Sequence, residues 1–264
     1  MKFASCDSFA TVGLYILLSF SNKFYIMKYL ILLLLAPVML FSCRWKNKTI
    51  NGNGKIVSES RTVSKAEKIK LEGSFDVEIT QGETTSVSIE TDENLQPYII
   101  LKESDHQLSL KEKSNYNLKS DQPIKVKITT PKLSKISLSG SGSIIGKNKF
   151  TGMNKLSINL SGSGDINLAI NTPDLDVNIA GVGTLVLSGE TKNARFDIAG
   201  SGDCDAASLQ TENTKVNVAG VGTVKVFAEV LLDVNVAGSG TVYYKGAATV
   251  KQKIAGIGTI KKMD

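Results

Sequence analysis

Val216-Asn217-Val218-Ala219-Gly220-Val221-Gly222-Thr223-Val224 is one of seven related stretches in the second half of this 264-residue chain. Each stretch has a Gly-x-Gly triplet at its centre, and the first glycines are Gly140, Gly162, Gly181, Gly200, Gly220, Gly238 and Gly256. Successive first glycines are 22, 19, 19, 20, 18 and 18 residues apart. Self-similarity at a short, nearly constant period is typical of repeat architectures. We therefore predict a fold built by stacking copies of one unit.

Apolar and polar residues alternate on both sides of each triplet. The residues four and two positions before the first glycine, and four after it, are almost all apolar, as in Val216, Val218 and Val224. The residue three positions before it is polar, as in Asn217. Period-two alternation predicts strands with one buried face. A repeated glycine pair between two such strands predicts a bend.

Equivalent positions in successive repeats match in residue type, which favours stacking of like on like over hairpins with Asn-Gly turns. We predict an all-β fold, a single-stranded parallel β-helix (β-solenoid) with about 19 residues per coil over residues 136–264. Right-handed coiling is expected of parallel crossover connections. Residues 55–135 alternate without the triplet, so we expect a β-rich N-terminal cap with the first coils, in one domain with the repeats.

The last repeat departs from the others. Gln252 replaces the apolar residue, Lys253 replaces the usual Asn, and two further lysines, Lys261 and Lys262, stand close to the end of the sequence. The end of a solenoid is an open strand edge, and lysines there oppose end-to-end association.

Residues 27–43 resemble a bacterial lipoprotein signal, since a lysine and a short apolar run precede Leu40-Phe41-Ser42-Cys43. The run is shorter than the 20 or so apolar residues of a membrane-spanning helix. We predict a signal peptide over residues 27–42, lipidation of Cys43, and a tether over residues 43–54. An uncleaved anchor helix is the alternative. Residues 1–26 are expected to be an extension before the true start at Met27, or else a second hydrophobic segment in tandem.

Composition limits the classes of partner. The formal net charge is +6, but the lysines are scattered and the chain has only three arginines, at positions 44, 61 and 195. Nucleic-acid-binding proteins cluster basic residues with stacking aromatics, so we expect no nucleic-acid partner. Partners should be a membrane, through the N-terminal lipid, and a glycan or an envelope protein.

The residues that usually carry catalysis or hold metals are sparse. His106 is the only histidine, and no Gly-x-Ser-x-Gly nucleophile motif accompanies it. Cys204 occupies an apolar position with no general base near it, so it is expected to be a buried, inert thiol. Asp165 and Asp203 resemble calcium-loop residues, but they should lie two coils apart, too far for one ion. We therefore expect no catalytic residue, no metal site and no cofactor.

Several motifs resemble a known family. They are Leu71-Glu72-Gly73-Ser74-Phe75-Asp76-Val77, Leu108-Ser109-Leu110, Thr130-Pro131-Lys132-Leu133 and Leu138-Ser139-Gly140-Ser141-Gly142, in that order. This set is similar to the head domain of auto-transporter adhesins, also called the head GIN domain, and covers about residues 65–264. The resemblance implies an exported β-helical protein, often a lipoprotein, with no established activity. It supplies no catalytic residues.

Three groups of residues are candidates for a surface site. Outward positions on neighbouring coils should bring Asp176 near Arg195. With Asp174 and Asp197 they form a set that has the residue types of polysaccharide-cleaving β-helix enzymes. An ordinary cross-strand ion pair is the simpler interpretation. Stacked amides could bind a glycan or merely join the coils, and an outward Tyr243 could stack on a sugar. The amides are Asn159, Asn178, Asn217 and Asn235.

These features predict a lipid-anchored cell-envelope protein, in the outer membrane, whose solenoid binds a partner or has a structural role. A carbohydrate-active β-helix enzyme, a lyase or a hydrolase, is the alternative.

Overall fold

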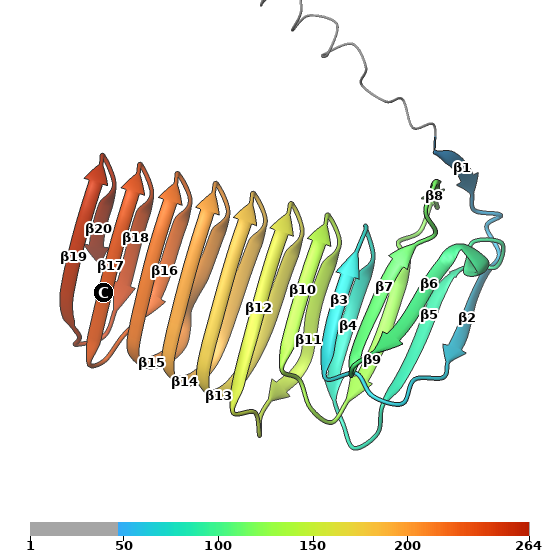
Figure 1. Ribbon diagram of the computed structural model, residues 1–264, viewed down its shortest axis with the longest axis horizontal. Helices are drawn as coiled ribbons and strands as arrows, with labels where there is room; N and C mark the ends of the chain where they lie inside the picture. The colour runs from blue at the N-terminus through green and yellow to red at the C-terminus, as the bar shows by residue number, and fades with distance from the viewer. Residues whose placement is uncertain (1–46, 264) are drawn as a thin grey trace, which may run out of the picture. The chain divides into compact units, whose positions relative to one another are not determined.

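The computed structural model describes residues 47–263, and the segment Asn47–Asp264 forms one compact unit. Cys43 and the predicted signal peptide lie outside the described residues. The unit is a stack of parallel β coils, drawn from yellow-green to red in Figure 1. The predicted β-solenoid and its coil length are therefore confirmed. Its strands are β10 (Lys135–Gly140), β11 (Ser143–Phe150), β12 (Lys155–Gly162), β13 (Asp165–Gly181), β14 (Thr184–Gly200), β15 (Asp203–Gly220), β16 (Thr223–Phe227), β17 (Leu231–Gly238), β18 (Thr241–Lys245), β19 (Thr249–Gly256) and β20 (Thr259–Lys262).

Each coil has two faces with the core between them. The strand that leads into a Gly-x-Gly corner rises on the near side of Figure 1, and the strand that leaves the corner descends behind it. We call the outer surfaces of these two strand sets the front face and the rear face. Successive coils move toward the C-terminus at the left of the view, which makes the coiling right-handed.

Like residues stack on like. Val216 lies in register with Phe196 and Val234 in the neighbouring coils, and none of the three side chains is exposed. Burial of one such side chain contributes about 1.5–3 kcal/mol relative to its exposure. The inward-facing residues of the coils thus form one continuous core.

The corners need glycine because successive coils touch there through their backbones. Gly220 has φ +145°, and a Cβ built on it would lie 2.0 Å from the carbonyl oxygen of Gly200. Side chains rarely adopt this conformation, and no side chain fits this space. The triplets are therefore structural corners.

The cap places its coils in an order that differs from the chain order. Strands β3 and β4 pair on one side with β10 and β11, and on the other side with β7 and β9, which come later in the sequence. Antiparallel strands then close this end, since β6 pairs with β7, β5 with β9, and β2 with β5. The cap elements are β2 (Ile56–Arg61), β3 (Lys68–Glu72), β4 (Asp76–Gln81), β5 (Ser86–Asp92), the 3-10 helix η1 (Gln96–Tyr98), β6 (Ile99–Ser104), β7 (Gln107–Glu112) and β9 (Lys125–Thr130).

The start of the described chain is attached to the cap. Strand β1 (Lys48–Asn51) pairs in parallel with β8 (Tyr116–Lys119). The buried carboxylate of Asp92 accepts hydrogen bonds from the Gly54 N–H at 2.6 Å and from the Ser120 hydroxyl at 2.5 Å. The bond from Ser120 is the main cause that lowers the pKa of Asp92. Of the predicted tether over residues 43–54, the part from Lys48 onward is thus held against the cap.

The last coil is open on one side in the described part of the chain. β19 pairs only with β17, and β20 only with β18. Gln252 is exposed, and Ile254 is 41% exposed, whereas Val236 one coil earlier is 2% exposed.

Candidate functional site

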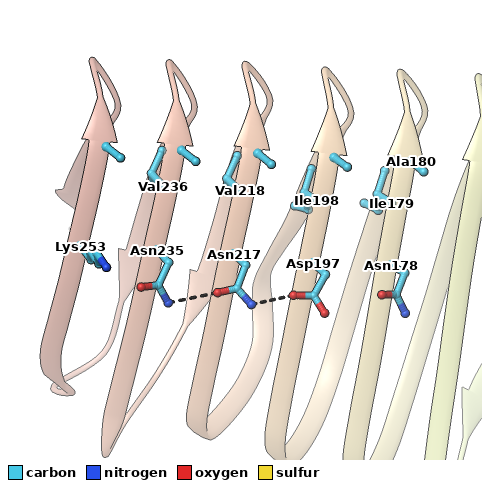
Figure 2. Close-up of a pocket in the computed structure, with 14 residues that line it drawn as sticks. Asn178, Ile179, Ala180, Asp197, Ile198, Asn217, Val218, Asn235, Val236 and Lys253 are labelled. Atoms are coloured by element: carbon cyan, nitrogen blue, oxygen red, sulfur yellow. Dashed lines mark hydrogen bonds between the residues drawn. The ribbon is translucent and has the colours of Figure 1, made fainter.

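A ladder of amide and carboxylate side chains runs along the front face. Strand alternation turns Asn178, Asp197, Asn217 and Asn235 outward, and the register aligns them across successive coils. Asn217 Nδ2 donates to Asp197 Oδ1 at 2.6 Å, and Asn235 Nδ2 donates to Asn217 Oδ1 at 3.0 Å, as Figure 2 shows. We call this column, together with Asn159, the Asn ladder. It joins coils and still leaves the amide nitrogens of Asn178 and Asn217 a second hydrogen each, whereas Asn235 Nδ2 also donates to Asp233 Oδ1 at 3.5 Å.

The ladder is interrupted at Asp197. Asn178 Nδ2 donates away from Asp197, to Asn159 Oδ1 at 3.2 Å. Between Asn178 and Asp197, both in the described part of the chain, no side-chain hydrogen bond forms, because Asn178 turns its Oδ1 toward Asp197 and an ionised carboxylate has no hydrogen to donate to it, as Figure 2 shows. Two acceptors are thus neighbours at this step, so a donor from a bound molecule could be accommodated there.

The charge of Asp197 is maintained by its neighbours. Partial burial raises the pKa of Asp197, but hydrogen bonds from Arg195 and Asn217, with the positive charges of Arg195 and Lys215, outweigh it and lower the pKa overall. Asp197 is therefore ionised at neutral pH.

A shallow groove of about 550 Å³ accompanies the Asn ladder. It is bordered by the ladder, and Lys253 lies at its C-terminal end, as Figure 2 shows. Its floor carries a column of exposed alanines, which are Ala180, Ala199, Ala219, Ala237 and Ala255. Small side chains at this position leave room for a ligand beside the amides. We call this the amide groove.

A second groove of about 530 Å³ on the same face is lined by charged residues. Asp176 lies in register with Arg195, as predicted. The ion pairs are arranged differently, however: Arg195 Nε bonds Asp197 Oδ2 at 2.7 Å within one strand, and Asp176 pairs with Lys155. Lys215 and Asp233 add a further pair at 3.5 Å. Asp176, Asp197 and Asp233 thus each pair with a cation, as in a cross-strand charge network, while Asp174 accepts a hydrogen bond from Asn193 Nδ2 at 2.9 Å.

Tyr243 does not join these residues. It lies on β18, on the rear face, in register with Lys225 and Lys261. Its neighbour Tyr244 packs against the core. The amides and Tyr243 could therefore not contact one small ligand together.

The remaining chemically active side chains are isolated. Cys204 is buried, and this burial strongly raises the pKa of its thiol. His106 lies in an exposed turn, and its Nδ1 is 3.8 Å from Glu67 Oε2. Within residues 47–263, no group of three or more His, Cys, Asp or Glu side chains is placed to hold a metal ion. No helix in that range is long and apolar enough to cross a membrane.

Sequence reasoning overlooked the alanine column. The residue before the first glycine is Ser or Ala in all seven repeats, and the alternation of apolar and polar residues by itself assigns this position no role. The structure shows these side chains exposed on the front face. The signal was present in the repeat, because an outward position that is always small predicts a hollow surface.

Comparison with known proteins gives a consistent result. Residues 66–248 match the family described as "Putative auto-transporter adhesin, head GIN domain". A crystal structure titled as a putative adhesin from Bacteroides fragilis is 27% identical, with a TM-score of 0.78, over 81% of this chain and 100% of that one. Two Parabacteroides distasonis structures, titled as a putative adhesin and a putative lipid binding protein, are 26% and 29% identical. Each of the two has a TM-score of 0.68 and is aligned over 82% of this chain and all of its own.

No protein with a curated description matches the chain. The matching family and the related structures are named as adhesins or as a lipid-binding protein, and none is named as an enzyme. The stacked coils, the Gly-x-Gly corners and the match over residues 66–248 lead to one conclusion: this chain belongs to the head GIN domain family.

Proposed function

We propose that this chain is an exported envelope protein, anchored by a lipid on Cys43, whose front face binds a linear glycan. The amide groove is the observation that carries the binding part of the proposal. Amides and a carboxylate offer the donors and acceptors that sugar hydroxyls need, and the alanine floor offers an apolar surface for the faces of sugar rings. The same groups recur at the 4.7–4.9 Å strand spacing, which suits a polymer better than a single small molecule.

A glycan array probed with the purified chain tests the binding. Ala219→Glu would fill the groove with a charged side chain, and Ser208→Glu on the rear face of the same strand is the matched control. We expect the groove variant to weaken binding roughly tenfold or more, and the control to bind as the wild type does. The proposal is wrong if no glycan binds, or if both variants lose binding equally.

The anchor is tested separately in the bacterium that produces the protein. Cys43→Ala should move the chain from the membrane fraction to the soluble fraction, and separation of inner from outer membranes should place the wild type in the outer membrane. An alanine variant that remained membrane-bound to the same extent would contradict lipid anchoring.

The charged groove does not have the arrangement of carboxylates that a glycoside hydrolase needs. Glycoside hydrolysis needs two carboxylates that face one sugar in different protonation states, whereas Asp176 and Asp197 each pair with a basic side chain. Depolymerisation of a bound glycan that is lost in Asp176→Ala and Asp197→Ala would favour the enzyme instead.

A further inference from the structure

A cluster of tyrosines and lysines surrounds the place where the described chain begins. The rings of Tyr98 and Tyr116 lie 4.7 Å apart between centroids. Lys113 Nζ is 5.8 Å from one ring centroid and 5.5 Å from the other. The Lys48 N–H donates to the carbonyl of Asn115 at 2.8 Å, so strand β1 begins directly on the turn that carries this cluster.

The short distance from the anchor restricts what this cluster can face. If Cys43 carries the lipid, as proposed above, five residue steps separate it from Lys48, and they span at most about 18 Å. The pairing of β1 with β8 and the Asp92 hydrogen bonds prevent the segment after Lys48 from extending this reach. The turn over residues 113–116 must therefore stay close to the lipid headgroups.

The residues of the cluster suit that position. Lys48, Lys113 and Lys119 are exposed and have no ion-pair partner among residues 47–263, while the nearby Lys55 is neutralised by Glu93. Two carboxylates are close to these lysines in sequence. Asp121 is exposed, and Glu112 is half-buried, accepts a hydrogen bond from the Leu118 N–H at 3.4 Å and has a pKa raised by burial. Tyrosine rings place an apolar body and a polar hydroxyl at the boundary between lipid and water. Lysines near an anionic surface are attracted to it over roughly a Debye length, about 8 Å in physiological salt.

We propose that this cluster, formed by Tyr98, Tyr116, Lys48, Lys113 and Lys119, seats the cap on a surface of anionic phospholipid. The inference rests on the lipid anchor proposed above. The seat would direct the cap toward the membrane. A second copy of the chain is a poorer occupant, because the same lysines would then face each other.

The test uses the full lipidated chain in vesicles of phosphatidylcholine, with and without phosphatidylglycerol. Because Cys204 is buried and Cys43 would carry lipid, a single introduced cysteine can be labelled with an environment-sensitive dye. Ser114→Cys reports on the cluster, and Ser239→Cys, on an exposed corner near the last coil, is the matched control. We expect anionic vesicles to shield the dye at position 114 and not the dye at position 239.

Lysine variants then test the cause. On anionic vesicles, the double variant Lys113→Gln with Lys119→Gln should lower the ratio of shielded to exposed dye at position 114 roughly fivefold for each lysine removed. The control double variant, Lys261→Gln with Lys262→Gln, should leave this ratio unchanged. Vesicle flotation separates the two proposals. If the chains float with the vesicles but the dye at position 114 is not selectively shielded, the proposed contact of the cluster with lipid is wrong and the anchor stands. If the chains do not float, both the anchor and this contact are wrong.

Discussion

Asn217 Nδ2 donates to Asp197 Oδ1 at 2.6 Å, so an amide of one coil is joined to a carboxylate of the preceding coil on the front face. Asp197 also accepts from Arg195 Nε at 2.7 Å. One carboxylate therefore connects the Asn ladder to the charged groove beside it. Its protonation should influence both the stability of the stack and the surface that a ligand meets.

The pH dependence of stability should reveal this role. The pKa of Asp197 is lowered in the folded chain because the bonds from Arg195 and Asn217 outweigh its partial burial. A group with a depressed folded pKa stabilises the protein above its unfolded pKa, about 3.9, and this stability is lost as the pH falls through the folded pKa. In urea unfolding at pH 7, the free energy of unfolding of the wild type should exceed that of Asp197→Asn by less than about 1 kcal/mol, because the site is partly exposed. The difference should shrink at pH 3, and a constant difference would contradict the assignment.

Replacement of a corner glycine should be far more costly than its backbone angle alone implies. We expect Gly220→Ala to lower the free energy of unfolding by at least about 3 kcal/mol. The new Cβ would clash with the Gly200 carbonyl, and the φ value suits glycine only. Gly152→Ala is the matched control, because Gly152 has φ +71° but no atom within 4 Å of the added Cβ. It should lose about 1 kcal/mol. Equal losses in thermal or urea unfolding would contradict the backbone contact.

The thiol of Cys204 should be inert until the protein unfolds. It is buried in the stack between Leu185 and Val224, and burial raises its pKa, so little thiolate is available. In a chain that carries Cys6→Ser and Cys43→Ser, so that Cys204 is its one thiol, an aromatic disulfide reagent at pH 8 should not react with the native protein but should react after urea is added. Ser208→Cys provides an exposed thiol on the same strand, which should react at once. Comparable native rates at positions 204 and 208 would contradict the core assignment.

The last coil should limit self-association. Gln252→Val with Lys253→Asn would give this coil the residues of the previous one, Val234 and Asn235, and would remove polar groups from an open edge. We expect the double variant to form dimers or longer assemblies in sedimentation velocity while the wild type does not. Lys192→Asn removes a positive charge from an exposed mid-stack position and should stay as the wild type. Assembly of the wild type itself at its solenoid end would refute this role.

Much of the solenoid follows from the sequence because its information is local. Alternation specifies which side chains are buried, and the repeat specifies which residues stack, so the register of Asp176 with Arg195 was predictable. The cap was less accessible. Gly73-Ser74-Phe75 forms a corner against Gly140 and Gly142. Because Phe75 stands where the repeats have their second glycine, the Gly-x-Gly pattern does not detect this coil. No local pattern indicates that β7 lies outside β3.

The candidate site shows the same division. Alternation turned the Asn ladder outward as expected, but it could not choose between Asp176 and Asp197 as the ion-pair partner of Arg195. Long side chains reach several neighbours, and the choice depends on competing cations such as Lys155. Tyr243 was correctly placed facing outward, while its position on the rear face depends on how the chain bends at the corner.

The order of strands in the cap has a consequence for how the chain folds as it is made. β3 is the first strand of the stack to be synthesised, yet both of its neighbours, β7 and β10, are synthesised later. β3 and β4 therefore remain unpaired on the growing chain until β7 and β9 have been synthesised. These pairings are long in sequence separation and should form slowly. Once they form, each new repeat can add to a finished edge, so assembly of the cap should limit the rate and the later coils should follow quickly.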